Sequence, residues 1–293
     1  MSAIAAGYVA DALLGDPVRL HPVAGFGHIA AAAERATYAP SRARGAAYAA
    51  GLVGAAAGAV ELVARRTRRA PVLAVVLWAS LGGRSLVRVG RRIGRLVDAD
   101  DIAGARDQLP WLCGRDPDDL DAAGLRRATV ESLAENTADA VVGPLFWGAV
   151  AGPAGAAAYR AANTLDAMVG HRSERYARFG WAAARLDDAL NWPVARATVA
   201  LTAVASGAPV ATIRTALADG ARHPSPNAGR VEAAFAGALG LRLGGPLAYG
   251  GRVEDRSVLG SGAAPGQGDV ERAARLSLKV GALAALCAAV VAR

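Results

Sequence analysis

Long runs of uncharged residues alternate along this chain with polar stretches that hold most of its charge. Residues 45–64 carry one charge, Glu61, and residues 140–159 carry none. Each run has 20 residues, and a helix of about that length crosses the roughly 30 Å hydrocarbon core of a bilayer. Pro144 and Pro153 interrupt the second run and predict kinks or a broken helix there. The pattern therefore predicts two membrane-spanning helices.

Three shorter runs have the same character. Residues 197–213 are uncharged, and residues 276–292 hold a single charge. Residues 70–83 are too few to cross a bilayer unless the long side chains of Arg84 and Arg88 extend to the headgroups. With these runs the chain is predicted to be an all-α, multi-spanning helical membrane protein with polar helical loops.

The polar stretches between these runs give no sign of a β-sheet. No alternating run is long enough for a sheet, and residues 254–269, rich in Gly and Ser, are predicted to form a flexible loop. We therefore expect a single membrane-embedded helical domain over residues 1–293. The alternative is a soluble all-α protein with buried, alanine-rich helices, because alanine is only weakly apolar.

Charge and composition add a preference for a membrane surface. The net charge is +8 and the charged residues, 20% of the chain, are clustered. Such a basic chain suits nucleic acid or an anionic membrane. With the long apolar runs we expect the cell membrane, as a multi-pass protein, and no nucleic-acid partner. Arginines flank both ends of residues 70–83, so the positive-inside rule leaves the orientation open.

Common sequence signatures are absent. Cys113 and Cys287 lie far apart and the four histidines show no ligand spacing, so neither a disulfide framework nor a zinc site is predicted. Residues 1–14 lack a basic start and a cleavage site, so we expect no cleaved signal peptide. The sequence contains no Walker phosphate loop, GxGxxG, GxSxG or HExxH.

Acidic side chains recur where residues 131–139 enter the second long apolar run. Glu131, Glu135 and Asp139 are four residues apart and project from one face of a helix. Carboxylates that enter an apolar span are costly unless they line a wet cavity or hold a cation. For Glu131 alone a solvated position is predicted, whereas Glu135 and Asp139, with Asn136, are predicted to be functional.

Two further polar groups follow. Asn163 and Asp166 lie three residues apart and can share a ligand. Asp187 and Asn191 are four residues apart with Asp188 beside them, a set of oxygen donors suited to Mg²⁺ bridged to phosphates. The alternative role for this second group is a helix cap, since carboxylates favour the N-terminal end of the helix dipole.

A rigid polar turn is predicted at residues 223–229, His-Pro-Ser-Pro-Asn-Ala-Gly. Its prolines break a helix, and Asn227 and Gly229 permit left-handed backbone conformations. Glu232 lies at the mouth of the alanine-rich segment that follows. A turn alone does not require this carboxylate, so the block is predicted to belong to the functional site.

Together these blocks resemble the adenosylcobinamide-phosphate synthase family, the membrane enzymes of late cobalamin biosynthesis. They cover more than a third of the chain in the family's order, whereas residues 42–128 and 250–269 match only in hydropathy. The combination of NTLD at 163–166, LDD…NW at 186–192 and SPNAG at 225–229 is specific. The matching stretches are GYVADALLGDP (7–17), HPV (21–23), ESLAENTADAVVGPLFW (131–147), AANTLDAMVGHRSERYARFGWAAARLDDALNW (161–192) and HPSPNAGRVEAAFAGALGLRLGG (223–245).

The resemblance implies an ATP-dependent acid–amine ligase. Such an enzyme joins aminopropanol or its O-phosphate to a propionate carboxylate of (adenosyl)cobyric acid, giving cobinamide or its phosphate. Its partners are the corrinoid, the amine and membrane lipid, and its cofactors are ATP and Mg²⁺.

Residue chemistry then suggests roles for that reaction. Asp187, Asp188 and Asn191 are the candidate Mg²⁺ ligands, and Glu135 or Asp139 is the candidate base toward the amine. Asp166 completes the candidate catalytic acids. Arginines can neutralise phosphates through bidentate contacts. The candidate substrate-binding residues are Asn163, Arg172, Glu174, Arg175, Arg185, Ser225, Asn227 and Glu232.

Two other functional classes also fit parts of the pattern. In a membrane-embedded prenyltransferase, Asp187, Asp188 and Asn191 would form an Mg²⁺-diphosphate cluster, although the usual further aspartate is Ala195 here. In a transporter, the intramembrane carboxylates would be coupling sites, but the polar turns would have no evident purpose.

Overall fold

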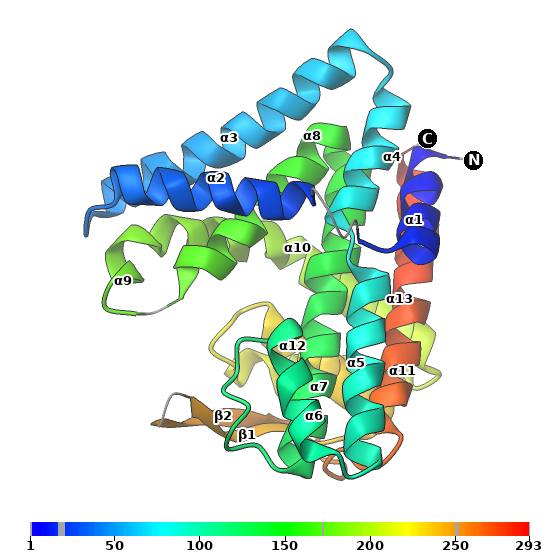
Figure 1. The fold of residues 1–293 in the computed structure, drawn as a ribbon. Coiled ribbons are helices and arrows are strands. Elements are labelled where there is room, and N and C mark those ends of the chain that lie inside the picture. Colours follow the sequence, from blue (N-terminus) through cyan, green and yellow to red (C-terminus); the bar gives the residue numbers. More distant parts are fainter. Residues whose placement is uncertain (1, 17–20, 172, 250–251, 293) are drawn as a thin grey trace. The chain divides into compact units, whose positions relative to one another are not determined.

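The computed structural model describes residues 2–16, 21–171, 173–249 and 252–292, with only the backbone described between residues 246 and 256. The chain forms two compact units, each built from segments that are distant in sequence. Unit 1 comprises residues 1–82, 139–193 and 284–293, and unit 2 comprises residues 83–138 and 194–283. Figure 1 labels the elements of both units.

Unit 1 packs its helices around α8 (Gly143–Leu165), which contacts each of the first four helices. A buried hydrophobic core within this unit includes Tyr48, Leu165, Val169 and Phe179. Its other elements are α1 (Ala3–Leu14), α2 (Pro22–Thr37), α3 (Arg42–Arg66), α4 (Arg69–Ser80), the π-helical turns η2 (Ala138–Val142) and η3 (Asp166–Gly170), α9 (Tyr176–Phe179), the first half of α10 (Trp181–Ser206) and the end of α13 (Asp269–Val291).

Unit 2 packs α7 (Ala122–Thr137) against α5 (Gly83–Asp98) and α12 (Ala228–Leu239). Its core includes Val87, Leu133 and Leu243, all buried. The remaining elements are α6 (Ile102–Gln108), η1 (Leu109–Trp111), the second half of α10, α11 (Pro209–Ala218), η4 (Gly220–Arg222), β1 (Leu243–Tyr249), β2 (Arg252–Leu259) and most of α13.

The predicted helical membrane protein is confirmed. Among the described residues, four helical stretches are long and apolar enough to cross a membrane: Arg42–Arg66, Arg69–Asp98, Ala122–Gly170 and Asp269–Val291. The short run at 70–83 belongs to a longer helical stretch, because α5 begins only two residues after the end of α4. The predicted break at Pro153 is also present, since Gly152 before it is non-helical, with φ 66°.

One predicted span is wrong. Residues 197–213 do not form a continuous helix, because α10 ends at Ser206 and α11 starts at Pro209. Gly207 between them has φ 73°, a left-handed conformation that ends a helix. The apolar run is therefore divided between two helices that meet at a turn.

A small antiparallel sheet was not predicted. β1 and β2 pair from Tyr249–Arg252 to Leu243–Leu259, with a bulge between Leu243 and Gly245. The expected flexible loop at 254–269 is therefore wrong for its first six residues, which are strand. The strands have no clear alternation, and the Gly-Gly dipeptide at 250–251 was the one local hairpin signal in the sequence.

Candidate active site

An asparagine amide joins two carboxylates in unit 1. Asn163 Nδ2 lies 3.4 Å from Oδ2 of Asp139 and 3.3 Å from Oδ1 of Asp187. The three side chains come from η2, α8 and α10, so three of the polar blocks meet here. Asp139 lies on a π-helical turn, a feature that is frequent at functional sites. The expectation that Asn163 shares a ligand with Asp166 stays a prediction, and these contacts add two aspartates as neighbours of Asn163.

Asn191 is fixed in the same network. Its Nδ2 donates to Oδ2 of Asp187 at 3.0 Å, and its Oδ1 accepts the hydroxyl hydrogen of Tyr159 at 2.8 Å. The tyrosine is buried, and its ring fits because residue 143 is glycine: a Cβ there would lie 2.2 Å from the ring. The hydroxyl donor sets which way the Asn191 amide points, and the amide then holds one face of the Asp187 carboxylate.

A guanidinium lies beside this network. Arg160 Nη1 donates to Oδ1 of Asn163 at 3.3 Å, and the charges of Asp139 and Asp16 act on the same side chain. The Nε atom of Arg160 and Oδ1 of Asp16 are buried without a hydrogen-bond partner in the described part of the chain. Asp139 and Asp16 thus act on this guanidinium, and Asp187 is linked to it through Asn163. Buried charges are normally paired or bound to metal, so carboxylates placed in this way can bind a cation.

Three members of this network were not predicted from the sequence. Asp16 was within the matching GDP stretch but was given no role, and Tyr159 was taken as part of an apolar run. Arg160 carried the clearest signal, because it is the first charge after 20 uncharged residues and lies one helical turn before Asn163.

A small cavity adjoins Arg160 in unit 1. Its volume is about 220 Å³, below the 300–1,000 Å³, roughly, of pockets for drug-sized ligands. It therefore has room for a small group and not for an enclosed corrin ring. Apart from Arg160, Ser80 and Thr164, the lining is apolar and comes from α2, α3, α4 and α8: Pro22, Val23, Phe26, Ala56, Val60, Val76, Ala79, Ala157 and Ala161.

Burial raises the pKa of Asp187 above its ordinary value, although the amide donors of Asn191 and Asn163 act to lower it. A metal ligand must be ionised, so metal binding at this carboxylate releases a proton when the side chain is protonated. Among the described residues, no three His, Cys, Asp or Glu side chains converge on a metal site. The protein side chains alone therefore do not form a closed metal cage in this part of the chain.

Asp188 and Arg185 lie on a more exposed side of α10. Their side chains pair at 3.2 Å, with 29% of Asp188 and 58% of Arg185 exposed, whereas Asp187 is 9% exposed. Adjacent residues of a helix point in directions about 100° apart. The two aspartates predicted to share a metal thus have different surroundings, one buried with amides and the other paired with an arginine near the surface.

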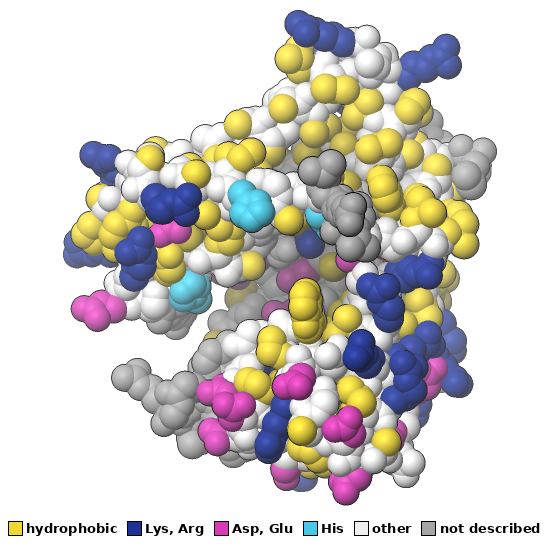
Figure 2. All heavy atoms as spheres, in the orientation of Figure 1, with side chains coloured by type: hydrophobic (Ala, Val, Ile, Leu, Met, Phe, Trp, Pro, Cys, Tyr) yellow, Lys and Arg dark blue, Asp and Glu magenta, His cyan; other side chains and the backbone are white. Residues whose placement is uncertain are grey.

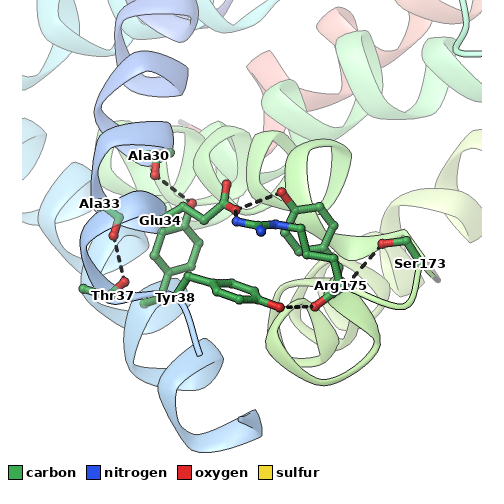
Figure 3. Close-up of polar contacts among 9 residues, drawn as sticks. Ala30, Ala33, Glu34, Thr37, Tyr38, Ser173 and Arg175 are labelled. Carbon is green, nitrogen blue, oxygen red and sulfur yellow. Dashed lines mark hydrogen bonds and ion pairs between the residues drawn. The ribbon is translucent and has the colours of Figure 1, made fainter. Parts of the chain in front are cut away.

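Arg175 is held by α2. Its Nη2 donates to Oε1 of Glu34 at 2.9 Å, the same oxygen that accepts from the Tyr176 hydroxyl. Its guanidinium also stacks 4.1 Å from the Tyr38 ring centroid, and the Tyr38 hydroxyl donates to the Arg175 carbonyl (Figure 3). These contacts fix the segment before α9 against α2 and account for the arginine without a phosphate. Nothing in them tests its predicted role in substrate binding.

The remaining unit 1 candidates are Asp166, Glu174 and Arg172. Asp166 begins η3, and its carboxylate lies against Gly170, where a Cβ would approach Oδ1 to 1.8 Å. Glu174 is exposed. Arg172 lies outside the described residues.

Four candidates belong to unit 2. Glu135 is half-buried on α7. Ser225 Oγ accepts the backbone N–H of Ala228 at 3.1 Å at the start of α12, and Asn227 Oδ1 accepts from Arg196 at 2.9 Å. The predicted polar turn is therefore present, with part of its polarity used to build the turn itself. Glu232 is buried near a histidine of that turn, His223, at 4.0 Å.

The solvated position predicted for Glu131 is wrong. Glu131 is 1% exposed, pairs with the buried Arg115 at 2.5 Å, and accepts the backbone N–H of Gly244 at 2.7 Å. Gly244 has φ 73° and forms the bulge of the hairpin, where a Cβ would lie 2.1 Å from the Ser257 carbonyl oxygen. The Glu131 carboxylate thus connects the hairpin to α7. The two residues in this contact are 113 positions apart, so the local sequence does not predict it.

We expect Glu131→Ala to destabilise unit 2. Removing one partner of a buried pair leaves an uncompensated charge on Arg115 and costs about 3–5 kcal/mol. Thermal unfolding in detergent measures this loss. The matched control is Asp98→Ala, which breaks the partly exposed pair with Arg126 at 2.9 Å and should cost about 1 kcal/mol or less. Equal losses in the two variants would contradict the buried pairing.

The comparisons with known proteins identify the family. The family model described as CobD/Cbib protein matches residues 4–277. This range includes the network around Asn163 and the buried pair of Glu131 and Arg115. The chain belongs to the CobD/Cbib family. It is 50% identical over 293 residues to the cobalamin biosynthesis protein CobD of Mycobacterium tuberculosis, covering 96% of this chain and 92% of the relative.

More distant relatives carry the same name. The chain is 43% identical over 276 residues to CobD of Chromobacterium violaceum, covering 91% of this chain and 88% of that one. It is 41% identical over 266 residues to CobD of Pelobacter propionicus, covering 85% and 82%. No solved structure matches the chain. Membership in the CobD/Cbib family confirms the predicted resemblance and favours a protein of cobalamin biosynthesis over the prenyltransferase and the transporter.

Proposed function

We propose that this member of the CobD/Cbib family joins aminopropanol, or its O-phosphate, to a propionate carboxylate of (adenosyl)cobyric acid. The product is cobinamide or its phosphate, linked through a new amide bond. A carboxylate does not condense with an amine unaided in water, and phosphoryl transfer from ATP supplies the activation. The enzyme is then an ATP-dependent acid–amine ligase in the cell membrane.

The bridging of Asp139 and Asp187 by Asn163 is the observation that carries this proposal. Mg²⁺ prefers oxygen ligands, and it is usually held by one or two carboxylates together with substrate phosphates. The two aspartates, with the Asn191 amide beside them, fit that pattern when phosphate oxygens complete the ligand set. The contacts support pairing Asp187 with Asp139 across Asn163 better than pairing Asp187 with Asp188.

The other residues of the network have roles that follow from their contacts. Arg160 offers a buried N–H of its guanidinium beside the carboxylates, where it can donate to an acceptor oxygen of the bound substrate. Tyr159 and Asn191 orient Asp187 and do not need to touch the substrate. A carboxylate bound to Mg²⁺ is a weak base, so the ligand role proposed for Asp139 replaces the role of base toward the amine that the sequence suggested for it.

Reconstitution of the reaction tests the proposal directly. Purified protein in detergent, supplied with cobyric acid, ATP, Mg²⁺ and aminopropanol or its phosphate, should form a corrinoid one aminopropanol unit heavier, detected by mass spectrometry. One ADP should appear for each amide formed. Reactions without ATP, or with chelator in place of Mg²⁺, are the controls and should give no product. Absence of product with either amine, from protein that remains folded, would refute the ligase assignment.

A further inference from the structure

A row of arginines follows one side of α5 in unit 2. This helix of 16 residues contains five arginines and one acidic residue, Asp98, at its end. Arg84, Arg88, Arg92 and Arg95 are three or four residues apart and all are exposed, so they share one face. The apolar residues of the helix are buried on the opposite side.

The first half of α13 packs beside this helix within unit 2. Arg91 donates twice to Glu271, at 2.8 and 2.9 Å, and the same carboxylate accepts from Arg275 at 2.7 Å. Three residues further along α5, a Cβ added at Gly94 would lie 2.9 Å from Val270. Position 91 thus meets 271 while position 94 meets 270, so the two helices run antiparallel.

This register brings cations from both helices to one end of the pair. The start of α5 carries Arg84 and Arg88, and the matching part of α13 carries Arg275 and Lys279. Figure 2 shows Lys and Arg side chains gathered over this part of unit 2. Lys279 is the single lysine of the chain, is exposed, and forms no ion pair with the described residues.

A pocket of about 220 Å³ opens on the α13 side of this face. Three cations line it, namely Arg272, Arg275 and Lys279, together with Ser206. The rest of its wall is apolar: Ala205, Ala238, Leu239 and Leu276. A rim of cations around an apolar wall suits a ligand that has a phosphate group attached to a hydrocarbon body.

The position of these cations along the chain indicates where such a ligand comes from. The apolar helix α4 ends three residues before α5 begins, and the uncharged end of α13 follows Lys279. The candidate membrane spans Arg69–Asp98 and Asp269–Val291 contain these two apolar stretches together with the cations next to them. The cations therefore occur where two spans change from apolar to polar, and clusters of four or more basic residues at that position attract anionic lipids.

We propose that this basic face, formed by Arg84, Arg88, Arg275 and Lys279 with the pocket beside them, binds the phosphate groups of anionic phospholipids. Arg92 and Arg95 lie farther along α5 from the apolar helix and contribute less, because the attraction decays within a Debye length of about 8 Å. The proposal does not depend on the ligase reaction, since it concerns residues outside the active-site network.

The chain also holds a second group of arginines that serves as a control. Arg65 and Arg69, at the turn between α3 and α4, both donate to Glu61, at 2.9 and 2.7 Å. Glu61 therefore neutralises part of their charge, as Glu271 neutralises part of the charge of Arg275 on the basic face. Arg66 and Arg68 beside them are exposed, so replacing these two removes the same charge as replacing two residues of the basic face.

The test compares lipid binding by two double variants of the full chain in uncharged maltoside detergent. Phosphatidylglycerol bound per protein is measured by native mass spectrometry. Each basic residue near an anionic surface contributes about 1 kcal/mol, so Arg88→Gln with Lys279→Gln should weaken binding roughly 30-fold. Arg66→Gln with Arg68→Gln should change it less than about threefold. Thermal unfolding confirms that both variants are folded, and Lys279→Gln alone provides a milder second variant.

Three further measurements complete the design. Phosphatidylcholine should bind much more weakly than phosphatidylglycerol to the wild-type protein, and raising the salt concentration should weaken phosphatidylglycerol binding. Inorganic phosphate at millimolar concentration should not displace the lipid. Equal loss in the two double variants, equal binding of the two lipids, or displacement by free phosphate would each overturn the proposal, the last by assigning the face to a soluble anion.

Discussion

Asp187→Asn should lower the turnover of the purified enzyme on the order of 100-fold or more, while the protein still folds and inserts. Loss of a carboxylate that holds Mg²⁺ removes several kcal/mol of charge stabilisation from the transition state, and each 1.36 kcal/mol corresponds to about a tenfold change in rate. Asparagine keeps the size of the side chain and can still bond to Asn163 and Asn191. Turnover with saturating ATP and thermal unfolding in detergent are the two measurements.

The neighbouring aspartate provides the matched control. Asp188→Asn makes the same chemical change one position along α10, where the carboxylate forms a partly exposed pair with Arg185, a contact worth about 1 kcal/mol or less. We expect its turnover to fall by less than about tenfold. Near-wild-type turnover in Asp187→Asn would show that the carboxylate is structural. An equally large loss in Asp188→Asn would restore the predicted metal pair of adjacent aspartates.

Sequence alone predicted the membrane spans because their cause is local. A helix of about 20 apolar residues satisfies its own backbone hydrogen bonds and matches the bilayer thickness whatever its neighbours are. The long runs at 45–64 and 140–159 therefore reappear in α3 and α8. The run at 197–213 is shorter than that length. There Gly207 ends one helix and Pro209 begins the next, so no single span forms.

The site was predictable only in part. Asp139, Asn163, Asp187 and Asn191 were selected as polar residues at the edges of apolar segments, and the structure brings them together. Their actual partners could not be read from spacing, because contacts across three elements depend on packing. Tyr159 shows this limit: it resembles any buried aromatic residue until the Asn191 amide is found beside its hydroxyl.

Glu131 shows the opposite error. Its position four residues before Glu135 suggested a solvated helix face, and a lone glutamate is usually exposed. Its two partners, Arg115 and the backbone of Gly244, lie 16 and 113 positions away along the chain. Burial of a charge is a tertiary property, so the sequence near it contains no signal for the arginine that compensates it.

Deletion of the gene should abolish the conversion of cobyric acid to cobalamin and leave the use of added cobinamide intact. The proposed reaction is the step that attaches the aminopropanol arm, so its loss blocks every precursor before that amide and none after it. Growth of the deletion strain under cobalamin-dependent conditions, with cobyric acid or cobinamide supplied, measures both halves of the prediction. A plasmid copy of the wild-type gene should restore the first half, and a copy with Asp187→Asn should not.

The pattern of rescue separates the possible failures. A deletion strain without a second copy of the gene that still converts cobyric acid would refute the assignment, because the amide would then be made by another enzyme. Rescue by neither compound would place the defect downstream of cobinamide. Rescue by cobinamide alone, together with failure of the Asp187→Asn plasmid, would connect the cellular step to the carboxylate that Asn163 and Asn191 hold in unit 1.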